Sequence, residues 1–295
     1  MKHPSIFLIP AIVALLSPLL LADTANKPSA ATPANTSSIT APATDPDDLT
    51  PAQKLHQWAI APSYSYSFFD NGQQGWQDQD TQLYYQLNKK WNLGLELDYR
   101  DRPPTGSDIL YSGFFSYTPT DKFELHGKIT GCFDPAFSAN EAYSIGFQYQ
   151  STRMLAPMLD FRGWNFNGQP INQVQPGVLI TIDDSSTLAI KYAHGWAFDT
   201  FQYNYYIAIY NYEFKSRQRL TIAFDYGVDP DVEVGYGSTS VLTLSPAYTG
   251  TIFFRQPLGQ DVDLYTGFEY DYRLNKSGGK LYQQYTPTLG MDWKF

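Results

Sequence analysis

The final stretch of the chain alternates strictly between two kinds of side chain. On one parity stand Tyr285, Pro287, Leu289, Met291, Trp293 and Phe295, and on the other stand Thr286, Thr288, Gly290, Asp292 and Lys294. Because successive side chains of a β-strand point to opposite faces, the pattern predicts a strand with one apolar and one polar face. Such a strand, ending on an aromatic carboxyl terminus, is typical of the closing strand of an outer-membrane barrel. We expect it also to be the segment that the barrel-assembly machinery binds.

The same alternation begins at Trp58 and recurs along the rest of the chain. In its clearest instance Trp91, Leu93, Leu95, Leu97 and Tyr99 are opposed by Asn92, Gly94, Glu96, Asp98 and Arg100. Strict alternation over that length indicates a strand rather than a helix. Counting such runs gives about 14 strands, within a range of roughly 12 to 16. An even number returns both termini to the periplasmic side. The sequence therefore predicts an all-β fold, a transmembrane up-and-down antiparallel β-barrel over residues 58–295.

The residues before the barrel divide into three predicted segments. Residues 1–22 have a basic N-terminal region, an apolar run and a small residue at the expected cleavage site. This combination indicates a cleaved signal peptide. Residues 23–50 are rich in Ala, Thr, Ser, Pro and Asp, so we expect a disordered, low-complexity periplasmic tether. Residues 51–57 follow a capping pattern typical of a short helix. The predicted location is integral to the cell outer membrane.

Charged residues at strand positions fall almost entirely on the parity opposite to the apolar residues. A charge facing lipid at mid-depth would cost about 2 to 4 kcal/mol, so this parity should line the lumen. We expect lumen-lining residues and any solute contacts among Glu96, Asp98, Arg100, Glu124, His126, Lys128, Arg162, Lys191, Glu269 and Asp271. These charges either pair across neighbouring strands and fill the interior, or form a selectivity lining. Both signs occur in similar number, so no strong ion preference follows.

Composition excludes several other classes of function. The net charge of −9 and the absence of any cationic run argue against a nucleic-acid partner. The single cysteine, Cys132, allows no internal disulfide, and we expect it as an unpaired thiol in a surface loop. No phosphate loop, zinc spacing or dinucleotide fingerprint occurs, so we expect no cofactor and no metal.

Candidate catalytic groups were weighed against plainer interpretations. His126 could meet Ser112 or Ser144 across the lumen as a lipase-like base and nucleophile, but such residues are common in barrel interiors. The carboxylates Glu269 and Asp271, or Asp229, Asp231 and Glu233 in a loop, could serve glycosidase chemistry or calcium. Solvated acidic residues are the favoured interpretation, and no catalytic residue is assigned.

A β-sandwich is the main competing fold, since its strands also alternate. It would bury the aromatic residues in a core, whereas here they cluster near the ends of the expected strands, as the aromatic girdles of a barrel do. Five prolines fall within strand-like runs and count against the expected register: Pro62, Pro157, Pro176, Pro246 and Pro287. We expect them at strand ends or bulges.

Two regions leave the register open. Asn71–Gln79 is polar and is expected to be a loop. Tyr203–Phe214 is expected to be a strand. Because it has tyrosines at adjacent positions, the sequence does not show which of the two alternating sets of side chains faces lipid. Tyr206 and Tyr210, if turned inward, would suit stacking against sugar rings.

With its strands placed, the chain resembles the YaiO-type outer-membrane β-barrel family from Ala59 to Phe295. The resemblance is carried by the Tyr-rich opening strand with its acidic polar loop, by Tyr99-Arg100-Asp101, by the loop Asp134-Pro135-Ala136-Phe137 leading into Asn140-Glu141-Ala142, and by the ending Trp293-Lys294-Phe295. It implies an outer-membrane location and an association with surface polysaccharide, and it supplies no catalytic residues. The low-complexity tether is not part of the family pattern.

The sequence thus favours an outer-membrane channel or surface component, surrounded by outer-membrane lipid, that passes or binds a small polar solute or a glycan through a mixed-charge lumen. The alternative is an outer-membrane enzyme that acts on lipid or polysaccharide. A third class is a plugged adhesin that uses its extracellular loops.

Overall fold

The computed structural model describes residues 58–197, 201–228, 246–274 and 278–295. The predicted signal peptide, tether and short helix lie outside these residues. So do the loop carboxylates Asp229, Asp231 and Glu233.

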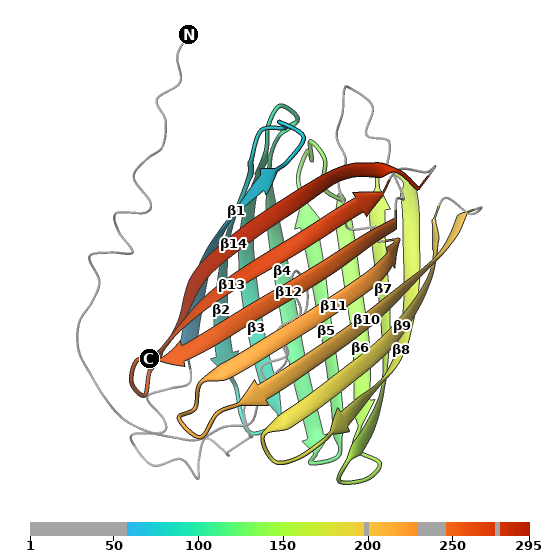
Figure 1. Cartoon of the computed structure of the whole chain (residues 1–295). Helices are drawn as coiled ribbons and strands as arrows, with labels where there is room; N and C mark the ends of the chain where they lie inside the picture. Colours follow the sequence, from blue (N-terminus) through green and yellow to red (C-terminus); the bar gives the residue numbers. More distant parts are fainter. Residues whose placement is uncertain (1–57, 198–200, 229–245, 275–277) are drawn as a thin grey trace.

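Fourteen antiparallel strands form one closed barrel, in which each strand pairs with its neighbours in sequence and β1 pairs with β14 (Figure 1). The strands are β1 (Trp58–Phe69), β2 (Trp76–Gln86), β3 (Trp91–Arg102), β4 (Gly106–Thr120), β5 (Phe123–Cys132), β6 (Glu141–Tyr149), β7 (Leu155–Phe166), β8 (Gln169–Thr181), β9 (Ser186–Ala197), β10 (Phe201–Glu213), β11 (Arg219–Val228), β12 (Pro246–Pro257), β13 (Val262–Leu274) and β14 (Lys280–Lys294). The predicted up-and-down antiparallel barrel and its strand number are confirmed. Closure of the sheet excludes the competing sandwich.

The last strand closes the barrel, as its alternation predicted. At the end of the barrel where the chain termini of the sheet meet, Trp58 N–H donates to the Phe295 carbonyl over 3.3 Å and Phe295 N–H donates back over 2.9 Å. We call this the terminal end and the opposite one the loop end. There the Asp70 carboxylate accepts a 2.8 Å bond from Gln283 N–H and pairs with Lys280. These two contacts, that of Lys280 first, hold the pKa of Asp70 below its usual value.

The outer face carries the apolar parity, which remains exposed in the isolated chain. Leu95 is 64% and Ile129 is 72% exposed. Aromatic pairs lie near both ends of the barrel: Trp91 stacks on Tyr117 at the terminal end, with ring centroids 4.2 Å apart, and Tyr226 stacks on Tyr248 at the loop end, 4.6 Å apart. An apolar band between two aromatic girdles is the outer surface that a barrel presents to a bilayer. Among the described residues, no helix is long and apolar enough to cross a membrane.

The prolines fit the strands differently from our expectation. Pro246 begins β12, at a strand end as expected. Three others lie within strands: Pro62, Pro176 and Pro287. Each of them pairs with a residue of one neighbouring strand and lies at a gap in the pairing with the other neighbouring strand. Pro157 lies just beyond the last pair between β6 and β7. A strand residue gives its N–H to one neighbour only, so a proline removes one bond and leaves the rest of the ladder intact.

Two further expectations are corrected. Asn71–Gln79 is not all loop, because β2 begins at Trp76 and its polar residues Gln77 and Gln79 belong to the strand. Cys132 is not in a surface loop. It is the last residue of β5 and is 6% exposed, because its parity is the inward one.

Candidate functional site: the polar interior of the barrel

All ten predicted lumen residues lie on strands at positions of the inward parity. Neighbouring positions of the opposite parity carry exposed apolar side chains such as Leu95, Leu97, Ile129 and Phe268. Contact of these ten residues with a solute stays a prediction, whereas the structure shows which of them contact one another.

One side of the interior is dominated by ionised side chains from β2 to β5, and we call it the charged wall. Its members are Asp78, Asp80, Glu96, Asp98, Arg100, Arg102, Asp108, Glu124, His126 and Lys128. Glu96 on β3 accepts a 2.6 Å bond from Lys128 Nζ on β5, so this ion pair bridges over β4. Both side chains are about nine-tenths buried, at 10% and 12% exposed. The contact therefore fixes the two side chains and fills the interior.

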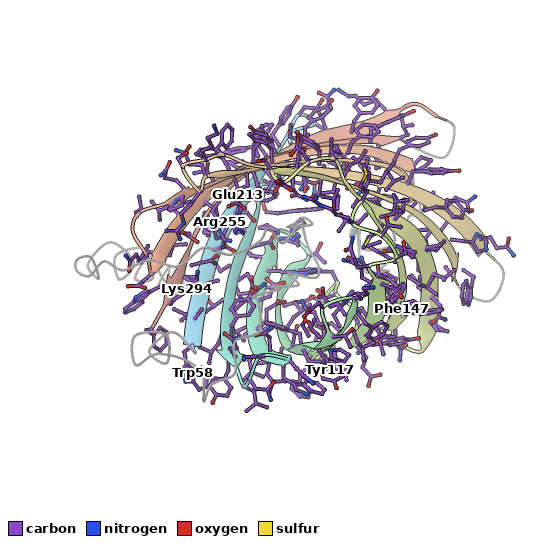
Figure 2. The ribbon with its side chains drawn as sticks, turned by 90° about the horizontal axis from the view of Figure 1, so that it is seen from below. Trp58, Tyr117, Phe147, Glu213, Arg255 and Lys294 are labelled. Carbon is purple, nitrogen blue, oxygen red and sulfur yellow. The ribbon has the colours of Figure 1, made fainter. Side chains whose placement is uncertain are left out.

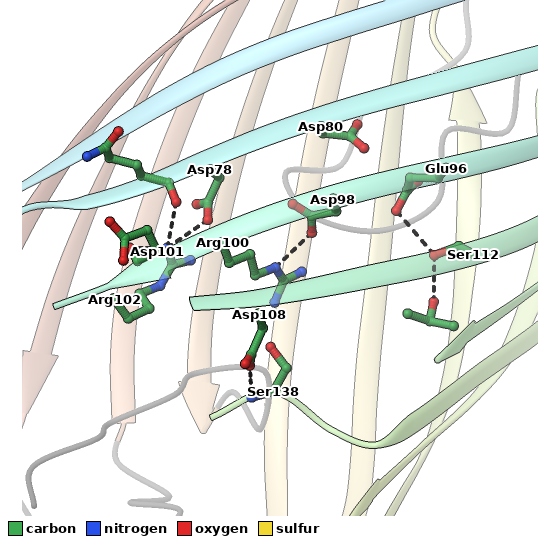
Figure 3. Close-up of polar contacts among 12 residues, drawn as sticks. Asp78, Asp80, Glu96, Asp98, Arg100, Asp101, Arg102, Asp108, Ser112 and Ser138 are labelled. Atoms are coloured by element: carbon green, nitrogen blue, oxygen red, sulfur yellow. Dashed lines mark hydrogen bonds and ion pairs between the residues drawn. The ribbon is translucent and has the colours of Figure 1, made fainter. Parts of the chain in front are cut away.

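Smaller polar groups complete the middle of this wall. Ser112 on β4 bonds to Thr130 over 2.9 Å and lies 3.4 Å from Glu96 (Figure 3). Gln82 donates to both Asp80 and Glu96, over 2.9 and 3.0 Å. Buried carboxylates are thus held by hydrogen bonds as well as by cations, as burial of a charge requires.

A second group of buried charges runs from the charged wall across β6, β7 and β8 to β9. Asp160 on β7 contacts His126 Nε2 on β5 at 2.9 Å and Lys191 Nζ on β9 at 2.7 Å. We call these three residues the relay. Its path requires small residues, because a Cβ on Gly146 of β6 would overlap both Asp160 and His126. Similarly, a Cβ on Gly177 of β8 would lie 2.8 Å from Lys191 Cγ.

The relay bears on the less favoured, lipase-like interpretation of His126. Its Nε2 bonds to Asp160 and not to a serine, while the Ser112 hydroxyl is engaged by Glu96 and Thr130. The glycine at 146 leaves the space in which the Asp160 carboxylate reaches the imidazole. The His126–Asp160 contact supplies a base and its orienting group without a nucleophile, which does not make a hydrolase site.

At the loop end the charged wall contains four residues that our sequence analysis missed as lumen residues: Asp78, Asp80, Arg102 and Asp108. Arg102 pairs with Asp78 at 2.7 Å, and Arg100 pairs with Asp98 at 2.7 Å (Figure 3). Asp78 lies in the segment predicted as a loop, and Asp80 follows directly after it. The period-two run Trp76, Asp78, Asp80, Gln82, Tyr84 could have revealed their strand.

The remaining predicted residues lie elsewhere around the ring. Asp271 on β13 pairs with Arg273 at 2.7 Å, and both side chains are about 5% exposed. Glu269 lies 3.4 Å from the Thr251 hydroxyl, and Glu124 lies 3.4 Å from that of Ser116. Arg162 follows Asp160 by two residues on β7 and is half-buried. Glu269 and Asp271 are thus engaged by separate partners, and not arranged around one shared ligand.

Ion pairs also line the terminal end of the interior. Glu213 contacts Arg219 at 3.3 Å, and Arg255 contacts Asp263 at 3.7 Å and also Asp292. Figure 2, a view along the barrel from below, shows Glu213 and Arg255 close together on the inner side of the ring. Both ends of the interior are therefore lined by paired charges.

The inner face of β8 to β11 differs from the charged wall. Its inward positions are mostly small or apolar, and we call it the apolar wall: Ile171, Leu179, Ala189, Ala193, Ala197, Tyr203, Tyr205, Ile207, Ile209 and Ala223. Ala189, Ile207, Ile209 and Ala223 form one buried cluster. Trp164, Ile171, Ala197 and Tyr203 form another, nearer the loop end.

The apolar wall settles the orientation of the doubled tyrosines. The suggestion that Tyr206 and Tyr210 turn inward is wrong. Tyr206 is 53% exposed and contacts Tyr192 on the outer face, and Tyr210 shares its parity. Tyr203 turns inward instead and is 3% exposed, because its ring lies over Gly195, where a Cβ would overlap it. The glycine that makes room for the Tyr203 ring lies on the neighbouring strand β9.

Within the described residues, no group of three or more His, Cys, Asp or Glu side chains is placed to hold a metal ion.

Comparisons with known proteins give the fold but no family. No protein-family model matches the chain, and no curated protein matches it. Solved structures do match. The chain is similar to a bacterial polysaccharide outer membrane secretin, with a TM-score of 0.58 at 10% identity over 82% of this chain and 99% of that one. It is also similar to the CymD monoaromatic hydrocarbon channel, with a TM-score of 0.55 at 8% identity over 81% and 88% of the two chains.

A Pseudomonas aeruginosa FadL homologue gives a TM-score of 0.54 at 8% identity, over 81% of this chain and 90% of that one. At such low identities these likenesses concern the fold alone. The chain is thus built as a closed antiparallel β-barrel of the kind found among outer-membrane channels.

Proposed function

We propose that the protein is an integral outer-membrane channel that lets a small polar solute or a glycan pass through a mixed-charge lumen. The observation that carries this proposal is the separation of the two faces of one closed sheet. The outer face exposes an apolar band between aromatic girdles, and the inner face holds paired charges. That arrangement is favourable in a bilayer, where each backbone group must be paired within the sheet and mid-depth charges must avoid lipid.

The location follows from the same surface. A barrel of this kind reaches the outer membrane after export, with the predicted signal peptide removed and its C-terminal strand engaged by the barrel-assembly machinery. Both termini of the barrel then lie on the periplasmic side, and the loop end is extracellular. The resemblance to the YaiO-type family, together with the likeness to a polysaccharide secretin, favours a glycan as the solute.

Planar-bilayer conductance tests the channel. Purified, refolded protein should give steady, single-sized ion steps, and proteoliposomes should swell in small neutral sugars. Heat-unfolded protein at the same concentration is the control. Absence of both steps and swelling would contradict the proposal.

The enzymatic alternative is tested in the same preparation. Wild-type protein and His126→Ala should show no hydrolysis of phospholipid or of surface polysaccharide, because His126 bonds to a carboxylate and not to a nucleophile. Hydrolysis that is lost in His126→Ala, in a barrel without conductance, would favour the enzyme instead.

A further inference from the structure

The loop that joins β5 to β6 folds against the inner face of the barrel. We call residues 133–140 the inner strap. Phe137 is 7% and Ser138 is 4% exposed, although a surface loop normally leaves such residues in water. Phe133, at the start of the strap, is 87% exposed and meets Tyr111 on the outer face. The chain therefore passes over the rim of the barrel and turns inward.

One carboxylate holds the middle of the inner strap. Asp108 on β4 accepts three backbone bonds, from the N–H groups of Ala136 at 2.6 Å, Phe137 at 3.2 Å and Ser138 at 2.7 Å. Figure 3 shows the last of these. The Asp108 residue is 3% exposed. Hydrogen bonds to an ionised acceptor are stronger than neutral ones, and three on one buried carboxylate fix the backbone of the strap.

An arginine holds the strap against β2 and β3. The Arg102 guanidinium lies 4.7 Å from the ring centre of Trp76 and 5.6 Å from that of Phe137. Asp78 on β2 pairs with the same guanidinium at 2.7 Å. Through Arg102, Phe137 is thus joined to β3 and β2. These strands lie two and three positions away from β5 around the barrel.

The other end of the strap packs toward the apolar wall. Ala139 contacts the buried cluster of Trp164, Ile171, Ala197 and Tyr203, which come from β7, β8, β9 and β10. Asn140 N–H donates to the Asn165 carbonyl over 2.9 Å, and its side chain accepts 2.7 Å from Asn167 N–H. The strap itself therefore contacts β3, β4 and β7, and it packs on a cluster that β7 to β10 share.

We propose that the inner strap is the size filter of the loop-end mouth and that Asp108 is the residue that holds the filter in place. This inference rests on the proposed channel function. In this proposal the strap covers the part of the mouth beside β3, β4 and the Trp164 cluster, and the solute passes where the described residues of the strap make no contact. The solutes admitted are narrow, such as small sugars or a single unbranched glycan strand, and bulkier solutes are excluded.

The chain carries its own reporter for the position of the strap. Cys132 is the single cysteine, is 6% exposed, and gives its N–H to the Asn140 carbonyl over 2.9 Å, which joins the two ends of the strap. If Asp108→Ala frees the strap, the rate at which a membrane-impermeant maleimide labels Cys132 should rise at least about tenfold, as loss of charge-assisted bonds predicts. The labelling rate should rise less in Asp108→Asn, which retains one acceptor oxygen.

The functional test is swelling of proteoliposomes in neutral sugars of increasing size. Asp108→Ala should admit a sugar larger than the wild-type limit and should give a larger single-channel conductance. Asp184→Ala is the matched control, because this carboxylate lies in the tight turn between β8 and β9 at the terminal end and its side chain is 91% exposed. It should change neither labelling nor size limit. Heat-modifiable migration on gels confirms that each variant is folded.

The outcomes separate this inference from the channel proposal. A raised size limit together with faster labelling supports the filter. If wild type swells and the folded variant keeps the same size limit, the filter is overturned whether or not labelling changes, and the channel stands. If no variant swells or conducts, the channel itself fails and the filter fails with it.

Discussion

The charged wall on β2 to β5 and the apolar wall on β8 to β11 occupy nearly opposite parts of the same strand order, yet they are held by different forces. On the charged wall, Glu96 and Lys128 stabilise each other only while both are present. On the apolar wall, Ile207 and Ile209 contribute by excluding water and filling space. The comparison shows that the stability of the charged wall depends on which side chains are paired, whereas that of the apolar wall depends on the volume that its side chains fill.

The relay connects these two walls and shows how strongly a buried charge depends on its partners. Lys191 belongs to β9, within the apolar wall, but its ammonium group is carried across β8 to Asp160. Asp160 in turn reaches across β6 to His126. The cation is therefore compensated by a group on another part of the barrel, because no carboxylate faces inward beside it on β8 or β10.

The largest expected effect is removal of the shared carboxylate. Asp160→Ala leaves Lys191 buried without its anion, and loss of one partner from a buried ion pair costs about 3 to 5 kcal/mol. Urea unfolding in lipid vesicles measures the loss. The double variant Asp160→Leu with Lys191→Met should recover most of it, since an apolar pair removes the uncompensated charge. A loss below about 1 kcal/mol for Asp160→Ala would mean that water solvates the relay.

A smaller effect is expected from the apolar wall. Ile209 is 2% exposed in its cluster, so Ile209→Ala should lower the free energy of unfolding by about 2 to 4 kcal/mol through lost burial and an unfilled space. Ile209→Leu conserves volume and should cost under about 1.5 kcal/mol. The same unfolding assay applies. Equal losses for the two variants would show that shape, and not volume, governs this wall.

The smallest effect is expected where two carboxyl groups of the charged wall lie opposite each other. Asp80 on β2 is directly opposite Asp98 on β3, and among the residues the structure describes it forms no salt bridge. Like charges directly opposite each other destabilise a strand pair, so Asp80→Asn should raise the free energy of unfolding by about 0.2 to 1 kcal/mol. Asp98→Asn is the control and should give no gain, because Asp98 pairs with Arg100. A loss in Asp80→Asn would indicate that the hydrogen bond from Gln82 to the carboxylate outweighs its repulsion by Asp98.

Much of the fold follows from strand periodicity, whereas the interior follows only in part. The alternation around Trp91–Tyr99 and Tyr285–Phe295 predicted which side chains face lipid, and the structure agrees. The same rule failed for Asp78, because polar outward residues such as Gln77 and Gln79 made the start of the strand resemble a loop. It also could not orient the doubled tyrosines of β10, where Gly195 on the neighbouring strand makes the space for Tyr203.

The sequence by itself determined the parity of most strands, and hence the barrel and the inward position of Glu96, His126 and Lys191. Parity is a local property, since it depends only on the direction of successive side chains along one strand. The tertiary structure alone decided that Lys128 reaches Glu96 across β4, that Asp160 joins His126 to Lys191, and that Asp108 holds the inner strap. The first two sets of contacts join strands that are not neighbours, and the third joins a strand to a loop. All of them depend on the register and curvature of the closed sheet.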